Sequence, residues 1–181
     1  MKQIDVKELK DNFFETIGKE WMLVTAGDAE HFNMMTASWG GIGWLWNKPV
    51  AFVFIRPERY TYEFAEQSDL LTLSFLGTSK DARQIYQICG TKSGRDMNKI
   101  VACGLTIEPT EQGAVAYSQS RLTLVGRKLY ADDLKSECFI DKQLLDRWYT
   151  VSEAAKQRDS GITNGLHKMY VVEIIDAYVN E

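Results

Sequence analysis

Apolar and polar residues alternate with a period of two through much of this chain, and Gly, Pro, Asn and Asp interrupt the alternation at short intervals. Such a pattern is typical of short β-strands joined by turns, so it favours an antiparallel barrel or sandwich. The pattern therefore predicts a mainly β fold with helices at its periphery. Seven segments fit a strand, namely residues 21–26, 34–39, 50–55, 70–75, 105–108, 121–130 and 166–179.

Two segments between the predicted strands have helical periodicity, residues 61–67 and residues 79–89. Ser79 can cap the second of these helices with its hydroxyl. One face of that helix would then carry Ala82, Ile85, Tyr86 and Cys89.

A third helix is predicted at residues 141–148, where Asp141 is placed to cap the first turn. Its apolar positions, which are spaced to pack inward, are Leu144, Leu145 and Trp148. Residues 151–164 are polar and show neither period, so we expect either an exposed connection or an arm that contacts a partner.

The composition is that of an ordinary globular protein, with 181 residues of which 45% are hydrophobic and 25% are charged. A chain of this size can bury one good core, so we expect residues 1–181 to form a single domain. The net charge of -4 and the pI near 5.3 give no field that would attract nucleic acid or an anionic membrane. Any bound anion therefore requires a local basic cluster.

The N-terminal residues alternate in charge and lack the apolar core of a signal peptide. No later stretch reaches about 18 uninterrupted apolar residues, so we expect a cytoplasmic protein that does not enter a membrane. The cysteines are widely spaced and form no Cys-x-x-Cys pair, which favours reduced, structural thiols. They are Cys89, Cys103 and Cys138.

Spacing argues against several familiar sites. The run at residues 90–94 lacks the glycines that a Walker loop needs. His31 and His167 are the only histidines, and neither has carboxylates at a metal-ligand spacing, so no protein metal site is expected. No Gly-x-Ser-x-Gly elbow is present, which leaves only a convergent triad for a serine hydrolase.

A first basic segment that could hold an anion lies at residues 93–99. It places a hydroxyl, a permissive backbone and two cations close together, as phosphate binding requires. These groups belong to Ser93, Gly94, Arg95 and Lys99. A solvated polar turn is the alternative interpretation of this segment.

A second basic segment, residues 56–61, strengthens the first interpretation. Pro57 keeps Arg56 extended, so that Arg56 can end a strand at a rim. Arg59, Tyr60 and Thr61 then open a helix whose first N–H groups can receive an anion. The two segments together predict a phosphate-binding site.

Aromatic residues are frequent near these polar groups, and such a wall suits a planar heterocycle that carries a phosphate. Phe52 and Phe54 share parity with Val50 on a predicted strand, so we assign both rings to core packing. Trp39 and Phe75 remain as candidates to contact the heterocycle. The glycines that follow fit either a bulge with close backbone approach or a flexible turn; they are Gly40, Gly41 and Gly43.

Six segments in this order and spacing resemble the flavin reductase-like, FMN-binding split-barrel family, close to its flavoredoxin branch. They are Asn-Met-Met-Thr-Ala-Ser-Trp-Gly-Gly at 33–41, Asn-Lys-Pro at 47–49, Arg-Pro-Glu-Arg-Tyr-Thr at 56–61, Leu-Ser-Phe at 73–75, Ser-Gly-Arg-Asp-Met-Asn-Lys at 93–99 and His-Lys-Met-Tyr-Val-Val-Glu-Ile at 167–174. The chain departs from the family at Val172, where glycine is frequent, and at Asn98, where an acid is common. These departures affect strand packing and loop charge more than the cofactor site.

The resemblance implies an antiparallel, Greek-key-type split barrel that forms a homodimer and binds FMN non-covalently near the subunit interface. The isoalloxazine and ribityl chain would then be lined by Asn33, Met34, Thr36, Ala37, Ser38 and Trp39. The phosphate side would be held by Arg56, Tyr60 and Thr61, and closed by Ser93, Gly94, Arg95 and Lys99. The ring would be flanked by Ser74, Phe75 and Leu76. His167 would lie near the flavin edge, as the one candidate for a catalytic side chain.

Flavin chemistry depends more on the cofactor than on any side chain, since hydride passes from nicotinamide to flavin N5 without an obligatory protein base. The resemblance therefore predicts an NAD(P)H-dependent flavin reductase, in which the backbone of residues 36–39 is the candidate donor strip for the flavin. One alternative is a flavoredoxin-type electron carrier that is reduced by a redox protein partner. Another is an FMN-binding protein whose activity is lost or regulatory.

Overall fold

Seven strands form one antiparallel sheet in the spatial order β3-β2-β6-β9-β10-β5-β4 in this computed structural model, which describes residues 1–149 and 165–180. A short strand β1 pairs with the end of β10, and β7 and β8 form a separate two-stranded ladder. The strands are β1 Lys2–Ile4, β2 Met22–Gly27, β3 Phe32–Ala37, β4 Gly40–Leu45, β5 Lys48–Ile55, β6 Leu70–Phe75, β7 Ile107–Pro109, β8 Val115–Tyr117, β9 Leu122–Asp133 and β10 Lys168–Val179.

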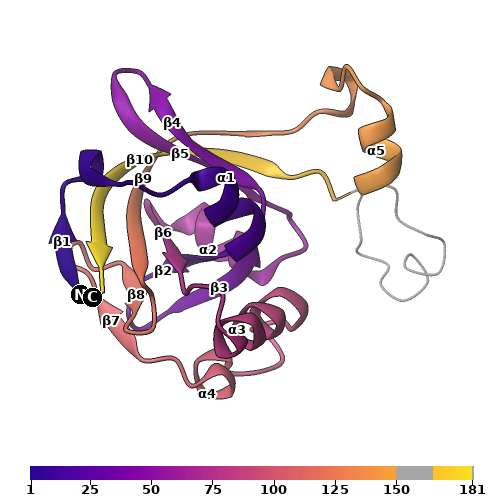
Figure 1. The fold of residues 1–181 in the computed structure, drawn as a ribbon. Coiled ribbons are helices and arrows are strands. Elements are labelled where there is room, and N and C mark those ends of the chain that lie inside the picture. The colour runs from indigo at the N-terminus through magenta and orange to yellow at the C-terminus, as the bar shows by residue number, and fades with distance from the viewer. Residues whose placement is uncertain (150–164, 181) are drawn as a thin grey trace.

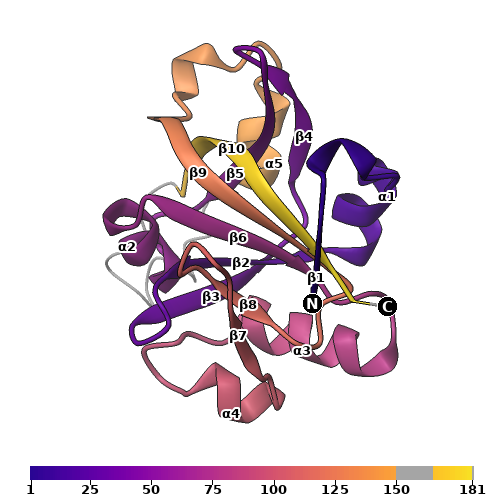
Figure 2. The ribbon, with the colours of Figure 1, turned by 90° about the vertical axis from the view of Figure 1, so that its left-hand side faces the viewer.

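The sheet rolls into a barrel because its two edge strands are consecutive in the chain. β3 ends at Ala37 and β4 begins at Gly40, so a two-residue connection brings opposite ends of the strand order together. The rolled sheet is visible in Figures 1 and 2. No ladder joins β3 to β4, and the barrel is therefore split along this seam. These features confirm the predicted mainly β, split-barrel architecture.

The helices lie around the barrel, with α3 and α4 packed together on one side (Figures 1 and 2). They are α1 Phe13–Glu15, α2 Tyr60–Gln67, α3 Lys80–Thr91, α4 Lys99–Cys103 and α5 Gln143–Trp148. Single helical turns occur at Val6–Glu8, Thr16–Glu20 and Ser136–Cys138. The predicted cap of α3 is confirmed, because the Ser79 hydroxyl accepts a hydrogen bond from the Ala82 N–H. No helix in the described residues is both long and apolar enough to cross a membrane.

Residues of β2 are buried on both faces and separate two apolar clusters. Met22, Val24 and Ala26 face the barrel interior, where they join the main core. Leu23 faces outward and packs in a second cluster with one face of α3. The predicted apolar face of α3 is confirmed, since all four of its residues belong to this second cluster: Ala82, Ile85, Tyr86 and Cys89.

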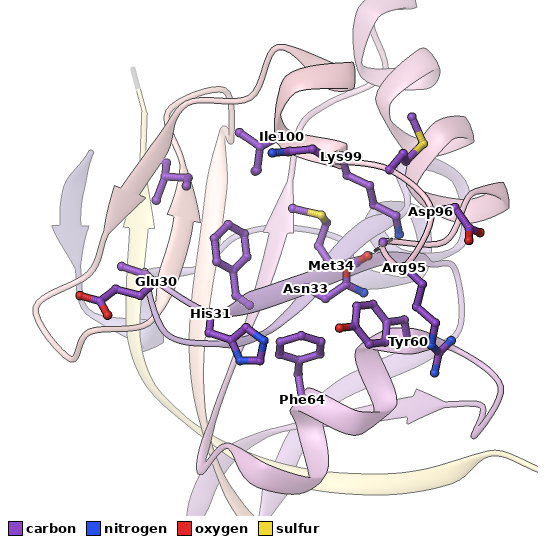
Figure 3. A pocket seen from close by; sticks show the side chains of 16 residues that line it. Glu30, His31, Asn33, Met34, Tyr60, Phe64, Arg95, Asp96, Lys99 and Ile100 are labelled. Carbon is purple, nitrogen blue, oxygen red and sulfur yellow. Dashed lines mark hydrogen bonds between the residues drawn. The ribbon is translucent and has the colours of Figure 1, made fainter.

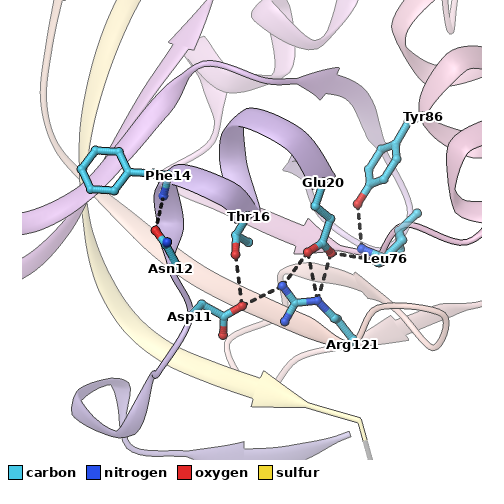
Figure 4. A network of polar contacts seen from close by, with 9 residues as sticks. Asp11, Asn12, Phe14, Thr16, Glu20, Leu76, Tyr86 and Arg121 are labelled. Atoms are coloured by element: carbon cyan, nitrogen blue, oxygen red, sulfur yellow. Dashed lines mark hydrogen bonds and ion pairs between the residues drawn. The ribbon is translucent and has the colours of Figure 1, made fainter.

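A partly buried ion network joins the segment before β2 to Arg121, the residue before β9 (Figure 4). The Arg121 guanidinium bonds to both carboxylate oxygens of Glu20 and, at 2.7 Å, to Oδ1 of Asp11. Glu20 also accepts a 2.6 Å hydrogen bond from the Gly77 N–H. The network therefore joins three segments that are distant in sequence.

Several expectations from the pattern need correction. The sequence pattern missed β1, β4, β8, α1 and α4. The glycine-rich β4 is a true strand, in which a Cβ on Gly40 would lie 2.7 Å from the Phe52 carbonyl oxygen, so close backbone approach was the better interpretation. Phe52 and Phe54 are not core residues, because Val53 and Ile55 take the inner face of β5.

The helix at α5 is present, but its packing was predicted wrongly. Leu144 and Trp148 are each 43% exposed, because α5 lies at the end of an arm that leaves the barrel (Figure 1). Asp141 does accept a hydrogen bond from the N–H of Gln143, the first residue of α5. The predicted connection or arm at residues 151–164 lies outside the described residues.

Candidate functional site

The free edge of β3 forms one wall of the candidate site. At the β2–β3 turn the Asp28 N–H bonds to the His31 carbonyl oxygen at 3.1 Å, which sets the alternation of hydrogen-bonded pairs along the ladder. By this alternation the backbone groups of Met34 and Thr36 point away from β2. The Met34 carbonyl oxygen indeed accepts a 2.8 Å hydrogen bond from Lys99 Nζ. The backbone N–H and C=O of Thr36 likewise point outward, at the free edge of β3.

A cavity of about 190 Å³ lies along this edge, near the seam of the barrel. Its walls are aromatic, since the Trp39 and His167 rings are 5.3 Å apart and the Phe54 and His167 rings 6.4 Å apart. We call this cavity the ring cavity; it is lined by Met35, Thr36, Ala37, Ser38, Trp39, Phe54, Arg56, Arg59 and His167.

His167 is held as a neutral imidazole in the wall of the ring cavity. Its side chain is buried, and its Nδ1 lies 2.8 Å from the Tyr149 hydroxyl. Burial lowers the pKa of His167 to about 4, and the nearby Arg56 charge adds to this effect. At neutral pH His167 therefore supplies hydrogen-bonding and packing rather than charge.

A second cavity, of about 140 Å³, lies at the start of α2. The N-cap residue Arg59 provides no side-chain cap, so the first N–H groups of α2 are available to a ligand. Thr61 Oγ1 accepts a 2.8 Å hydrogen bond from Asn33 Nδ2, which ties this helix to β3. We call it the anion cavity; it is lined by Asn33, Glu58, Arg59, Tyr60, Thr61, Thr91, Lys92, Ser93 and Lys99.

Two cations, the buried Lys99 and the partly buried Arg59, border the anion cavity and bond to backbone carbonyls at the end of α3. Lys99 is only 5% exposed, and its Nζ lies 2.8 Å from the Met34 oxygen and 3.3 Å from the Cys89 oxygen. Arg59 donates to the carbonyl oxygens of Gly90 at 2.7 Å and Cys89 at 3.1 Å. Burial lowers the pKa of both cations. Within residues 1–149 and 165–180, no carboxylate forms an ion pair with either of them.

The two cavities together fit a phosphorylated planar ligand such as FMN. Arg59 lines both of them, so the two cavities are neighbours, and each is also lined by residues of β3. At one end, cations that form no ion pair among the described residues, together with free helix N–H groups, suit a phosphate. An aromatic wall beside outward peptide groups at the other end suits a heterocycle that carries hydrogen-bonding edges. The donor set therefore agrees with the expected cofactor.

A larger cavity of about 680 Å³ adjoins the anion cavity, with which it shares Asn33, Tyr60 and Lys99 (Figure 3). Its floor is aromatic, because the Phe64 ring lies 4.7 Å from His31 and 5.0 Å from Tyr60. Its rim is charged and includes Glu30, Arg95 and Asp96.

The loop over these cavities is packed tightly at Gly94. A Cβ at this position would lie 2.1 Å from Asn33 Oδ1 and 3.2 Å from Cδ1 of Tyr60. Arg95 lies over the Tyr60 ring, 4.5 Å from its centre, and pairs with Glu63. Met34 and Gly94 line the large cavity together with Arg95. Most of the predicted cofactor residues thus surround three adjoining cavities.

The predicted ring-flanking residues on β6 are not brought to these cavities. The Ser74 hydroxyl is buried against that of Thr123 at 3.2 Å, between β6 and β9. Phe75 is fully buried in the main core, 6.4 Å from the ring of Phe13. The Leu76 N–H donates to the Tyr86 hydroxyl at 2.7 Å. In the sheet, β2 separates β6 from the free edge of β3.

Two cavity residues, and one residue that contacts His167, were missed or given another role from sequence. Arg59 was expected to open a helix within a basic segment and was not among the named cofactor residues, yet it is a partly buried cation that lines two of the cavities. Phe54 was assigned to the core, yet it lines the ring cavity. Tyr149, which contacts His167, carries no sequence signal because it lies on the arm. Arg56 is less available than expected, since it donates to the Trp148 carbonyl oxygen at 2.8 Å and lies over the Tyr149 ring.

Comparison with known proteins identifies the family of this chain. Residues 14–181 match the model of the flavin reductase like domain. A search of curated protein sequences gave no match.

Solved structures with the same fold include flavoredoxin of Desulfovibrio vulgaris (Miyazaki F), with a TM-score of 0.62 and 21% identity over 89% of this chain and 69% of that one. Flavoredoxin from Methanosarcina acetivorans has a TM-score of 0.63 and 17% identity, over 100% of this chain and 77% of that one. Nitrilotriacetate monooxygenase component B from Bacillus cereus has a TM-score of 0.62 and 14% identity, over 100% and 82% of the two chains.

Proposed function

The chain belongs to the flavin reductase like domain family, and from this premise we propose that it binds FMN non-covalently and acts as an NAD(P)H-dependent flavin reductase. The observation that carries the proposal is the pair of cations, the buried Lys99 and the partly buried Arg59, beside the uncapped start of α2. Buried positive charge without an acidic partner is costly to a protein, and a bound phosphate would compensate it.

The phosphate of FMN is assigned to the anion cavity and its isoalloxazine to the ring cavity. Lys99, Arg59 and the first N–H groups of α2 would hold the phosphate. The outward peptide groups of Thr36 would hydrogen-bond the edge of the heterocycle. Bound FMN supplies the capacity to accept and pass on electrons. Trp39 and Phe54 line that region with aromatic surface, and His167 adds no charge to it at neutral pH.

The large cavity supports the proposal that a nicotinamide dinucleotide is the electron donor. β3 runs from this cavity to the ring cavity, and its six residues extend over about 17 Å. An extended dinucleotide could therefore place its nicotinamide at the ring cavity and its adenosine among His31, Tyr60 and Phe64. Arg95 would meet the phosphates at the rim.

The second candidate function is a flavoredoxin-type electron carrier. The fold that this chain shares with two flavoredoxins favours this alternative.

We further propose that the protein is a cytoplasmic homodimer. Trp44 and Trp46 are 61% and 56% exposed on the β4–β5 hairpin, which projects from the barrel (Figure 1). Large exposed aromatic side chains of this kind are typical of interfaces. The thiols of Cys89, Cys103 and Cys138 are free, as in proteins of a reducing compartment. Sedimentation velocity of the wild type and of a Trp44→Ser/Trp46→Ser variant tests the dimer.

The deciding experiment is the visible spectrum of the purified protein, first alone and then after anaerobic addition of NADPH or NADH. We expect flavin absorption that is bleached by one of the two nucleotides. Absorption that persists until a reduced redox protein is added would favour the carrier. A colourless protein that also fails to bind added FMN would contradict the whole proposal.

A further inference from the structure

Two cysteines from different helices lie in contact behind the anion cavity. The Sγ atoms of Cys89, near the end of α3, and Cys103, at the end of α4, are 3.8 Å apart. Both are free thiols. Cys89 is fully buried, whereas Cys103 is partly exposed. Cys103 is therefore the member of the pair nearer to solvent, and the Cys89 sulfur already lies beside its sulfur.

The backbone of Cys89 also contacts both cations of the anion cavity. The Cys89 carbonyl oxygen accepts hydrogen bonds from Lys99 Nζ at 3.3 Å and from Arg59 Nη2 at 3.1 Å. The segment between the two cysteines includes the loop that carries Ser93 and Gly94. A covalent bond between Cys89 and Cys103 would close this entire loop at its base.

We propose that Cys89 and Cys103 are a redox modification site, which a hydroperoxide converts into a reversible disulfide. The Cys103 sulfur attacks the peroxide, the O–O bond breaks, and a sulfenic acid and an alcohol (water from hydrogen peroxide) are formed. The Cys89 sulfur then attacks the Cys103 sulfur and displaces water. Two thiols are oxidised by two electrons, the peroxide is reduced, and a dithiol can later restore both thiols.

The required movement is small. A disulfide has an S–S bond of about 2.05 Å, so the two sulfur atoms must approach by about 1.8 Å. α4 has only five residues and ends at Gly104, whose φ of 61° forms a left-handed turn that can adjust. Burial raises the pKa of Cys89 to about 12 and also raises that of Cys103, so the pair reacts slowly and stays reduced without an oxidant.

The consequence for the cofactor rests on the proposed function. A loop that is closed at its base loses conformational freedom, so Lys99 and the Ser93–Gly94 turn are held over the anion cavity. Oxidation should therefore slow the release of FMN by about fivefold. The protein would release flavin when reduced and retain it when oxidised.

The test uses the full chain in a Cys138→Ser background, which removes the exposed third thiol. The protein is treated with hydrogen peroxide, alkylated while unfolded and digested with trypsin, whose cleavage sites separate residues 84–92 from residues 100–121. We expect a linked pair of these peptides, two hydrogens lighter than their sum, that separates on reduction. Cys89→Ser in the same background should stop at a Cys103 sulfenic acid, and Cys103→Ser should leave Cys89 unmodified.

Recovery of both peptides alkylated, or a link found only between chains, would overturn the proposal. Because this readout needs no flavin, it stands or fails independently of the proposed function. The rate of FMN release is then compared before and after oxidation, with Cys89→Ser as the control. A disulfide that forms without changing this rate would overturn the assigned effect on the cofactor but not the modification site.

Discussion

The ammonium group of Lys99 lies 2.8 Å from the carbonyl oxygen of Met34, so one buried hydrogen bond joins α4 to the free edge of β3. A charged group held in this way has no carboxylate to balance it among the described residues. Its position between the anion cavity and the large cavity places this charge where a phosphate would benefit from it.

Replacement of Lys99 by Met should therefore weaken FMN binding much more than it weakens the fold. Loss of one charge-assisted hydrogen bond corresponds to about 1–3 kcal/mol, so we expect the Kd to rise by roughly 10- to 100-fold. Flavin fluorescence quenching measures this change. Lys80→Met, at the exposed start of α3, is the matched control and should leave the Kd unchanged. If the Lys99 variant and the wild type bind FMN with equal affinity, the assignment of the FMN phosphate to the anion cavity is wrong.

A second prediction concerns the contact of Gly94 with Asn33. In Gly94→Ala the new methyl group would need the space of Asn33 Oδ1, which lies 2.1 Å away. Because Asn33 is tied to Thr61, we expect the loop to move outward instead. FMN affinity should fall by about tenfold, equivalent to about 1.4 kcal/mol.

The control for this substitution is Gly18→Ala, because a Cβ on Gly18 would meet no atom within 4 Å. Titration of both variants with FMN separates a local steric effect from a general effect of the added methyl group. If the two variants bind FMN alike, Gly94 is not required for close approach.

A third prediction follows from the neutral state of His167. Its pKa is lowered to about 4 in the folded protein, against 6.5 as the ordinary value. Between these values the unfolded chain binds the proton and the folded protein does not, so the free energy of unfolding decreases as pH falls. The full contribution is present above pH 6.5 and is lost near pH 4. A shift of about 2.5 pH units corresponds to about 3 kcal/mol.

Urea unfolding between pH 4 and pH 7 tests this prediction in the wild type and in His167→Asn. The variant removes the titrating group while Asn can still meet the Tyr149 hydroxyl. We expect the difference in unfolding free energy between the two proteins to change by about 3 kcal/mol over this range. Parallel pH profiles would show that His167 is protonated equally in both states.

The sequence predicted secondary structure best where the residues of one element are sufficient to specify it. β6 was predicted with its exact bounds because its alternation is undisturbed. The helix α3 was predicted within two residues of its bounds, because its cap and its apolar face agree. β4 was missed because three of its residues are glycines, which are poor strand formers until pairing with β5 holds them.

The candidate site was less predictable because it depends on which strands become neighbours. Phe75 and Trp39 both looked able to contact a ring, but β6 lies inside the sheet and the residues after β3 lie at its edge. Nothing local distinguishes these two cases. Likewise, Arg56 and Arg59 occur in one motif, and only the packing of α3 gives Arg59 its hydrogen bonds to the Cys89 and Gly90 carbonyl oxygens.

The last prediction concerns the ion network of Arg121, Glu20 and Asp11, which joins the segment before β2 to the residue before β9 (Figure 4). The Glu20 side chain is only 8% exposed, so Arg121→Met would leave a buried carboxylate without its cation. Such a loss typically costs about 3–5 kcal/mol, and we expect a decrease of that size in the free energy of unfolding at pH 7. Arg127→Met is the matched control, since Arg127 is 55% exposed where it pairs with Glu173 and should contribute at most about 1 kcal/mol. Equal costs for the two substitutions would mean that water reaches Glu20 and that the network does not hold these segments together.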